Sequence, residues 1–97
     1  MTISEWCIAA QLVSQQHGFV TTLENLPARL MLVVTECAEV VEAWRKRDDQ
    51  HIGEELADIV IRTVEIAASL GIDLERAMDE KHERNKNRPY LHGGKRG

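Results

Sequence analysis

The spacing of apolar residues between the two prolines of this chain restricts it to helical folds. Only Pro27 and Pro89 interrupt a helix-favouring sequence of 97 residues. After Pro27, apolar side chains recur at steps of three and four residues, the period of one helix face: Leu30, Val33, Val34, Cys37, Val41 and Trp44. A second stripe contains Leu56, Ile59, Val60, Val64 and Ala67. We therefore expect an all-α protein whose two central helices bury these stripes in a core.

Capping and turn residues divide the chain into four helices. Thr2 and Glu5 form a capping-box pattern, Gly71 suits a left-handed C-cap, and Asp73 suits an N-cap. The predicted helices cover about residues 3–17, 27–44, 51–70 and 74–86. Because short loops make sequential helices antiparallel neighbours, we expect a four-helix, antiparallel bundle-like protomer.

The length of the chain predicts one domain that associates with copies of itself. Residues 1–97 are expected to form a single all-α domain with a basic, flexible tail over about residues 88–97. A chain this short buries only about 60% of its unfolded surface, so its core is marginal. Association into a homodimer or homotetramer through helix packing would add to that core.

Charge and hydropathy exclude several classes of protein. The net charge of −4 argues against a nucleic-acid binder, which needs a basic surface. No window of 18 apolar residues predicts a membrane span, and the first residues lack the features of a secretory signal. Cys7 and Cys37 show no metal or redox spacing, so we expect two buried, unpaired thiols in a reducing, cytoplasmic environment.

Two pairs of carboxylates interrupt the apolar stripes. The second predicted helix carries Glu36 and Glu39, and the third carries Glu55 and Asp58. Because residues three apart share one helix face, the pairs can meet if the two helices pack as a hairpin. Burying ionised carboxylates costs several kcal/mol each unless a cation or hydrogen bonds compensate. An all-oxygen cluster of this kind suits a hard divalent cation such as Mg²⁺.

The competing interpretation is that these pairs are ordinary solvated helix faces. The chain holds 16 acidic residues, and helices commonly carry such faces. Two pairs on neighbouring helices, each flanked by aliphatic residues, favour the metal site more than one pair would. The basic residues that follow Lys81 add a group that suits an anion bridged to the cation.

The carboxylate motif resembles that of a known family. Glu36-x-x-Glu39, fifteen residues and then Glu55-x-x-Asp58 is similar to the signature of all-α nucleoside triphosphate pyrophosphohydrolases of the MazG type. The resemblance covers roughly residues 26–95. It implies a helical, oligomeric, Mg²⁺-dependent enzyme that cleaves a nucleoside triphosphate between its α and β phosphates.

The resemblance also implies roles for individual residues. Glu36, Glu39, Glu55 and Asp58 would hold Mg²⁺, for which Mn²⁺ can substitute. Either Glu36 or Glu39 would orient or deprotonate the attacking water, and the sequence does not choose between them. The later segment is similar to the lysine, asparagine and Arg-Pro segment of many MazG-like proteins, and its phosphate-binding candidates are Lys81, Asn85, Arg88 and Lys95.

Several functions remain open at this stage. The expected activity converts nucleoside triphosphates to monophosphates and pyrophosphate, as in house-cleaning of the nucleotide pool. A phosphoribosyl-ATP or dimeric dUTP-type hydrolase of the same superfamily would use a related carboxylate pattern. A non-enzymatic helical dimerisation module would leave the acidic pairs solvated. A di-iron bundle would require Glu-x-x-His pairs on two helices, which the sequence lacks.

Overall fold

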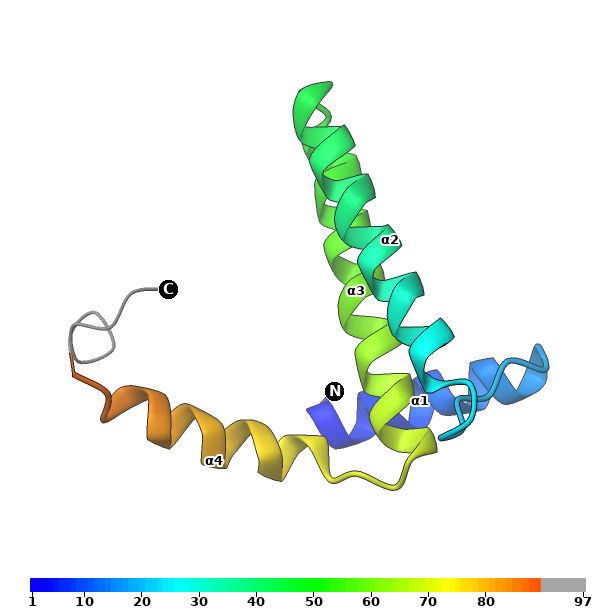
Figure 1. The fold of residues 1–97 in the computed structure, drawn as a ribbon, viewed down its shortest axis with the longest axis vertical. Helices are drawn as coiled ribbons and strands as arrows, with labels where there is room; N and C mark the ends of the chain where they lie inside the picture. The colour runs from blue at the N-terminus through cyan, green and yellow to red at the C-terminus, as the bar shows by residue number, and fades with distance from the viewer. Residues whose placement is uncertain (90–97) are drawn as a thin grey trace.

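The computed structural model describes residues 1–89, which form four α-helices (Figure 1). These are α1 (Ile3–Gln16), α2 (Leu26–Arg45), α3 (Asp49–Ser69) and α4 (Leu74–Lys86). No strand occurs within residues 1–89, so the predicted all-α class is confirmed. Helix α3 begins two residues earlier than predicted, because the Asp48 side chain caps it by accepting the backbone N–H of His51 at 3.2 Å.

Predicted capping residues are confirmed at three other helix ends. The Glu5 backbone N–H donates to Thr2 Oγ1 at 3.1 Å and the Thr2 N–H donates to Glu5 Oε1 at 2.8 Å, which completes the capping box of α1. Gly71 has a φ of 70°, the left-handed conformation expected after α3. Asp73 accepts the backbone N–H of Arg76 at 3.1 Å and begins α4.

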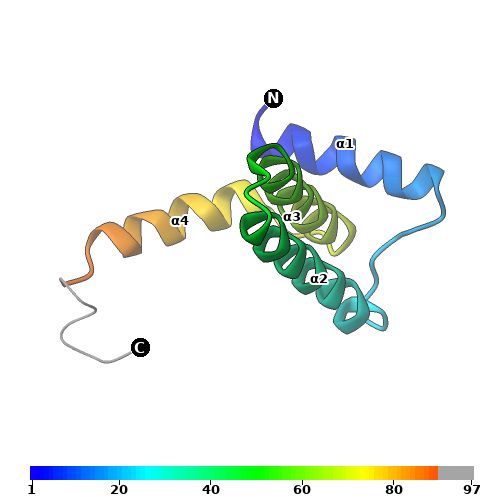
Figure 2. The same cartoon turned by 90° about the horizontal axis from the view of Figure 1, so that it is seen from above.

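Helix α3 lies at the centre of the molecule. Figures 1 and 2 show α2 running antiparallel to α3 on one side and α1 crossing its end on the other. Within the part of the chain described, no Cα atom of α2 lies within 8 Å of a Cα atom of α1 or α4. The antiparallel arrangement predicted for sequential helices therefore holds for α2 and α3, whereas α4 projects away. Helix α4 has few apolar residues beyond Leu74, Ala77 and Met78, so little drives it onto α3.

The core lies where α1 crosses α3. Cys7 and Ala10 of α1 pack against Val64 of α3, and Ile3, Ala68 and Leu74 surround them. These are mostly small side chains, so the apolar area buried within one protomer is modest. Of the helices in residues 1–89, none combines the length and the hydropathy needed to cross a membrane.

The apolar stripe of α2 is not buried in the protomer, so this expectation was wrong. Glu36 and Ala43 face inward, whereas Trp44 is 68% exposed and Cys37 is exposed as well. The buried face of α2 lies one residue, or about 100°, away from the predicted stripe. Apolar periodicity identifies a face but does not show what covers it. We call the exposed stripe on the hairpin the outer apolar face: Leu30, Val34, Cys37, Val41 and Trp44 of α2 with Leu56 and Val60 of α3.

Candidate metal centre between α2 and α3

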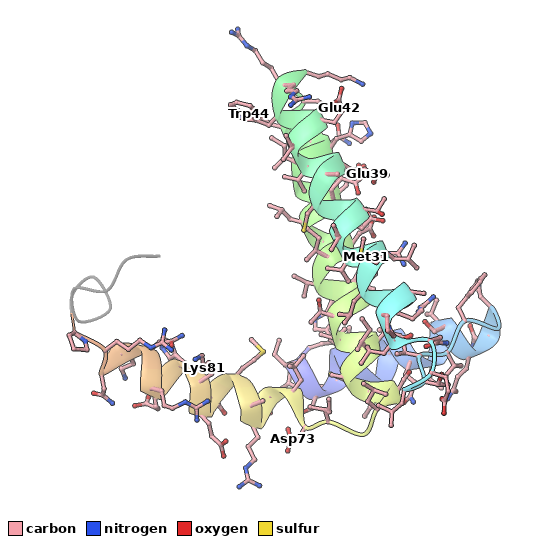
Figure 3. The ribbon with its side chains drawn as sticks, viewed as in Figure 1. Met31, Glu39, Glu42, Trp44, Asp73 and Lys81 are labelled. Atoms are coloured by element: carbon pink, nitrogen blue, oxygen red, sulfur yellow. The ribbon has the colours of Figure 1, made fainter. Side chains whose placement is uncertain are left out.

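Three of the four predicted carboxylates meet between α2 and α3. Glu36 and Glu39 of α2 and Glu55 of α3 each offer an oxygen, and these oxygens all lie within 4.8 Å of one another. Glu36 is buried, Glu55 is half-buried and Glu39 is exposed, so the group is open to solvent at Glu39. We call these three residues the carboxylate trio. Figure 3 shows Glu39 projecting from one side of the hairpin and Trp44 from the other.

Two oxygens of the trio lack hydrogen-bond partners. Glu36 Oε2 and Glu55 Oε2 are shielded from solvent, and no donor in the described part of the chain reaches them. A buried carboxylate oxygen without a partner costs free energy, because it has lost its hydration. A proton shared between the carboxylates or a cation between them would remove this cost.

The pKa values within the trio follow from this crowding. A hydrogen bond with Glu36, then one with Glu39 and burial, raise the pKa of Glu55 to about 7. The same bond from Glu55, assisted by Glu39 and the Arg62 guanidinium, holds the pKa of Glu36 below its usual value. In the absence of a cation, Glu55 is therefore mostly protonated below about pH 7.

This proton makes the stability of the cation-free protein depend on pH. Unfolding returns the pKa of Glu55 from about 7 to 4.5, so the unfolded chain releases a proton that the folded protein holds. We expect the Tm to fall as pH rises from about 4.5 to about 7 and to level off above that range. Thermal melts followed by circular dichroism measure this trend.

Two controls isolate the contribution of Glu55. Glu55→Gln removes the titrating group and should make the slope clearly shallower. A saturating divalent cation should instead raise the Tm most above pH 7, since cation binding requires ionised carboxylates. If Glu55→Gln melts with the slope of the wild type, the proton on Glu55 is not the cause.

A guanidinium holds the buried member of the trio. Arg62 of α3 donates from Nε to Glu36 Oε1 at 3.3 Å, and its Nη2 lies 3.3 Å from the same oxygen in an ion pair. Arg62 was not among the predicted site residues. Arg62 lies seven residues after Glu55, two helical turns along the same face, so the spacing itself offered a signal.

One cavity is lined by members of the trio, and a second is lined by Arg62, which contacts Glu36. One, of about 330 Å³, is lined by Glu39 and Glu55 together with Glu42, Ala43, Lys46, Asp48 and His51. The other, of about 390 Å³, lies between α1 and the hairpin and is here called the α1–α3 cleft. Its walls include the apolar side chains of Trp6, Val13 and Ile61 and the charged groups of Asp58, Arg29 and Arg62.

Asp58 does not join the trio within the part of the chain that the structure describes. It is exposed, lies one helical turn after Glu55 and lines the α1–α3 cleft near Arg62. The structure thus brings together Glu36, Glu39 and Glu55, and it places Asp58 at the neighbouring cleft.

The family follows from a comparison of the whole sequence with known protein families. Residues 24–92 match the model of the MazG nucleotide pyrophosphohydrolase domain, which spans all of α2, α3 and α4. The chain belongs to the MazG family. No curated protein and no solved structure gives a significant match. Enzymes of this family generally use divalent metals, and the carboxylate trio lies within the matched region.

The basic residues of this MazG domain lie apart from the trio. Lys81, Asn85 and Arg88 are exposed at or beyond α4, and in residues 1–89 no Cα atom of α4 lies within 8 Å of a Cα atom of α2. Figure 3 shows Lys81 on the projecting helix, well separated from Glu39. Lys81 and Asn85 line a separate pocket on α4. Lys95 and the predicted tail after Pro89 lie outside the described residues.

A second buried carboxylate fixes the MazG hairpin to the segment before it. Glu65 of α3 is 2% exposed and accepts hydrogen bonds from the Thr21 hydroxyl at 2.9 Å and from Ser69 Oγ at 3.2 Å. Arg29 of α2 donates to Glu65 Oε1 at 3.2 Å and to Thr21 Oγ1 at 3.3 Å. This fully paired network joins the 17–25 connection, α2 and α3, and it forms one wall of the α1–α3 cleft.

Proposed function

We propose that this MazG domain is a Mg²⁺-dependent nucleoside triphosphate pyrophosphohydrolase. The observation that carries the proposal is the carboxylate trio, whose oxygens lie within 4.8 Å of one another and include two shielded oxygens without a donor. An all-oxygen set of this charge suits Mg²⁺ or Mn²⁺. Glu36, Glu39 and Glu55 would hold the cation, and Asp58, one helical turn after Glu55, lies at the neighbouring cleft.

The reaction hydrolyses the bond between the α and β phosphates. Water adds to the α phosphorus, pyrophosphate leaves, and the products are a nucleoside monophosphate and pyrophosphate. When bound, the cation neutralises charge on the phosphate oxygens and on the leaving pyrophosphate. The carboxylates of the trio would bind the cation at the place where it can neutralise that charge.

Glu39 is our candidate for the residue that orients the attacking water. It is exposed and lines the 330 Å³ cavity, so a water molecule can reach it. Glu36 is buried and bonded to Arg62, which leaves it less free to accept a proton from water. The structure thus favours Glu39 between the two candidates that the sequence left open.

The α1–α3 cleft is where we place the nucleoside. It adjoins the trio through Arg62, and Trp6 gives it an aromatic wall on which a base can stack. Its charged residues, Asp58, Arg29 and Arg62, supply donors and acceptors for the edge of a base or for a ribose. Such a cleft combines the apolar walls and the few polar groups typical of small-molecule sites.

Pyrophosphate release from a panel of triphosphates tests the activity. The eight standard ribo- and deoxyribonucleoside triphosphates, with oxidised and methylated analogues and phosphoribosyl-ATP, are assayed with Mg²⁺ and with Mn²⁺. Preference for altered bases would support nucleotide-pool cleaning. Preference for dUTP or phosphoribosyl-ATP would assign the chain to those activities. No turnover of any member would overturn the proposal.

We further propose that the protein self-associates through the outer apolar face. An exposed apolar surface spanning two helices is typical of an interaction site, and a second copy offers the same surface. Self-association also gives α4 a function. Since Lys81, Asn85 and Arg88 lie apart from the trio of their own chain, they would bind the phosphates at the site of a partner copy.

Introducing a charge at Val41 should disrupt this association. Val41 lies on the outer apolar face, so Val41→Glu would bury an unpaired carboxylate in the interface. We expect the dimer dissociation constant to rise at least about 30-fold, the change for an interface hot spot. Sedimentation equilibrium measures the constant, and the rate at which thiol reagents modify Cys37 reports exposure of the face.

Leu23→Glu is the matched control, because Leu23 is an exposed leucine in the connection before α2 and lies off the outer apolar face. It should leave the dissociation constant and the Cys37 modification rate close to those of the wild type. A wild-type protein that is monomeric at every concentration would rule out this interface.

A further inference from the structure

Arg62 contacts only one of the two oxygens of Glu36. Its Nε donates to Oε1 at 3.3 Å, and its Nη2 lies 3.3 Å from the same oxygen. The other oxygen, Oε2, is shielded from solvent and has no donor among residues 1–89. The guanidinium therefore fixes the Glu36 carboxylate in one orientation while leaving its second oxygen unoccupied.

The side chain of Arg62 lies between α1 and the hairpin. It is 34% exposed and lines the α1–α3 cleft and a second cavity that His17, Phe19 and Leu32 also border. The Glu36 side chain is only 10% exposed. A planar fork between two packed elements can hold a carboxylate more rigidly than a lysine can, since an ammonium is a single point of charge.

We infer that Arg62 is the positioning residue of the cation site, which holds Glu36 by Oε1 and keeps Oε2 available as a ligand. The inference rests on the proposed cation site. Residues that orient metal ligands in this way lie outside the ligand set, and their loss typically weakens metal binding about 10- to 100-fold.

The sign of the effect separates this role from a simple charge effect. A positive charge near a cation site repels the cation, so removing Arg62 would strengthen cation binding if only its charge mattered. Removing a residue that orients Glu36 weakens binding instead. The two explanations thus predict opposite changes in the dissociation constant for the cation.

The test measures Mn²⁺ binding without nucleotide. Electron paramagnetic resonance of free Mn²⁺ gives the dissociation constants for the wild type, Arg62→Leu, Arg62→Lys and Lys46→Ala. Lys46 is the charge control: it lines the cavity shared by Glu39 and Glu55 but is ion-paired with Glu42 rather than with the trio. We expect weakening of about 10- to 100-fold for Arg62→Leu, a smaller loss for Arg62→Lys, and unchanged or slightly tighter binding for Lys46→Ala.

Each outcome decides the inference. Binding by Arg62→Leu that equals or exceeds that of the wild type would overturn it and leave the cation site intact. If Arg62→Leu does not fold, Arg62→Lys decides alone, because it keeps the charge and loses the fork; binding equal to the wild type would overturn the inference. If the wild-type protein binds no Mn²⁺, the proposed cation site itself is wrong.

Discussion

Glu39→Gln is expected to lower kcat/KM for the best triphosphate substrate by about 10²- to 10⁴-fold, the range for losing a general base. The amide keeps the size of the side chain but loses the negative charge that a cation needs and the basicity that an attacking water needs. Glu39 is exposed, so the substitution should leave the fold intact. A continuous assay of pyrophosphate release, with the best triphosphate as the only substrate, measures the change in kcat/KM.

Glu42→Gln is the control for this prediction. Glu42 lies three residues after Glu39 on the same helix and lines the same cavity. Its carboxylate oxygens, however, form ion pairs with Arg45 Nη1 at 3.7 Å and with Lys46 Nζ at 3.8 Å. Because Glu42 lies outside the trio, its loss should change kcat/KM by less than about threefold, as expected of an exposed ion pair. Equal losses for the two variants would mean that the general acidity of the cavity matters rather than Glu39.

Glu65→Ala is expected to have the largest effect on stability, lowering the free energy of unfolding by about 3–5 kcal/mol. The substitution leaves the Arg29 guanidinium partly buried without its carboxylate and removes the acceptor of the Thr21 and Ser69 hydroxyls. Urea denaturation, analysed with the slope of the wild type, measures the loss. Glu80→Ala, which removes an exposed pair with Arg76, should cost less than about 0.5 kcal/mol.

A double variant separates lost pairing from lost packing. Arg29→Met combined with Glu65→Leu removes both charges and replaces them with apolar side chains. Since a buried charge without a partner is the main cost, the double variant should be more stable than Glu65→Ala. If it is less stable, packing around Glu65 rather than charge pairing holds the connection before α2.

The sequence predicted where the helices begin and end better than it predicted which face of each helix is buried. Prolines, glycines and capping residues act locally, so Thr2, Gly71 and Asp73 marked helix ends that the structure confirms. The direction of α4 could not be predicted in the same way. It depends on which surfaces pack together, and few apolar side chains of α4 specify a partner.

For the carboxylate pairs, too, local spacing was predictable from the sequence and long-range packing was not. Spacing placed Glu36, Glu39 and Glu55 close together, because residues three apart share one helix face, but the same spacing did not bring Asp58 into the group. The sequence also assigned Trp44 and Cys37 to the core, although both are exposed in the protomer. Hydrophobicity predicts that a helix face will be buried. It does not show whether the same chain or a second chain buries it. Glu65 was missed because its buried ion pair with Arg29 is a long-range contact with no local pattern, whereas Arg62 lies two helical turns after Glu55 and could have been found from that spacing.

The two faces of α2 constrain the length of that helix. The residues that contact α3 and the residues of the outer apolar face are neighbours in sequence, so one added or deleted residue turns the remainder of α2 by about 100°. A deletion just before Glu36 would therefore turn Val41 and Trp44 toward α3 and carry the carboxylates toward bulk water. Related sequences should tolerate many substitutions between Pro27 and Arg45 but no change in the number of residues there.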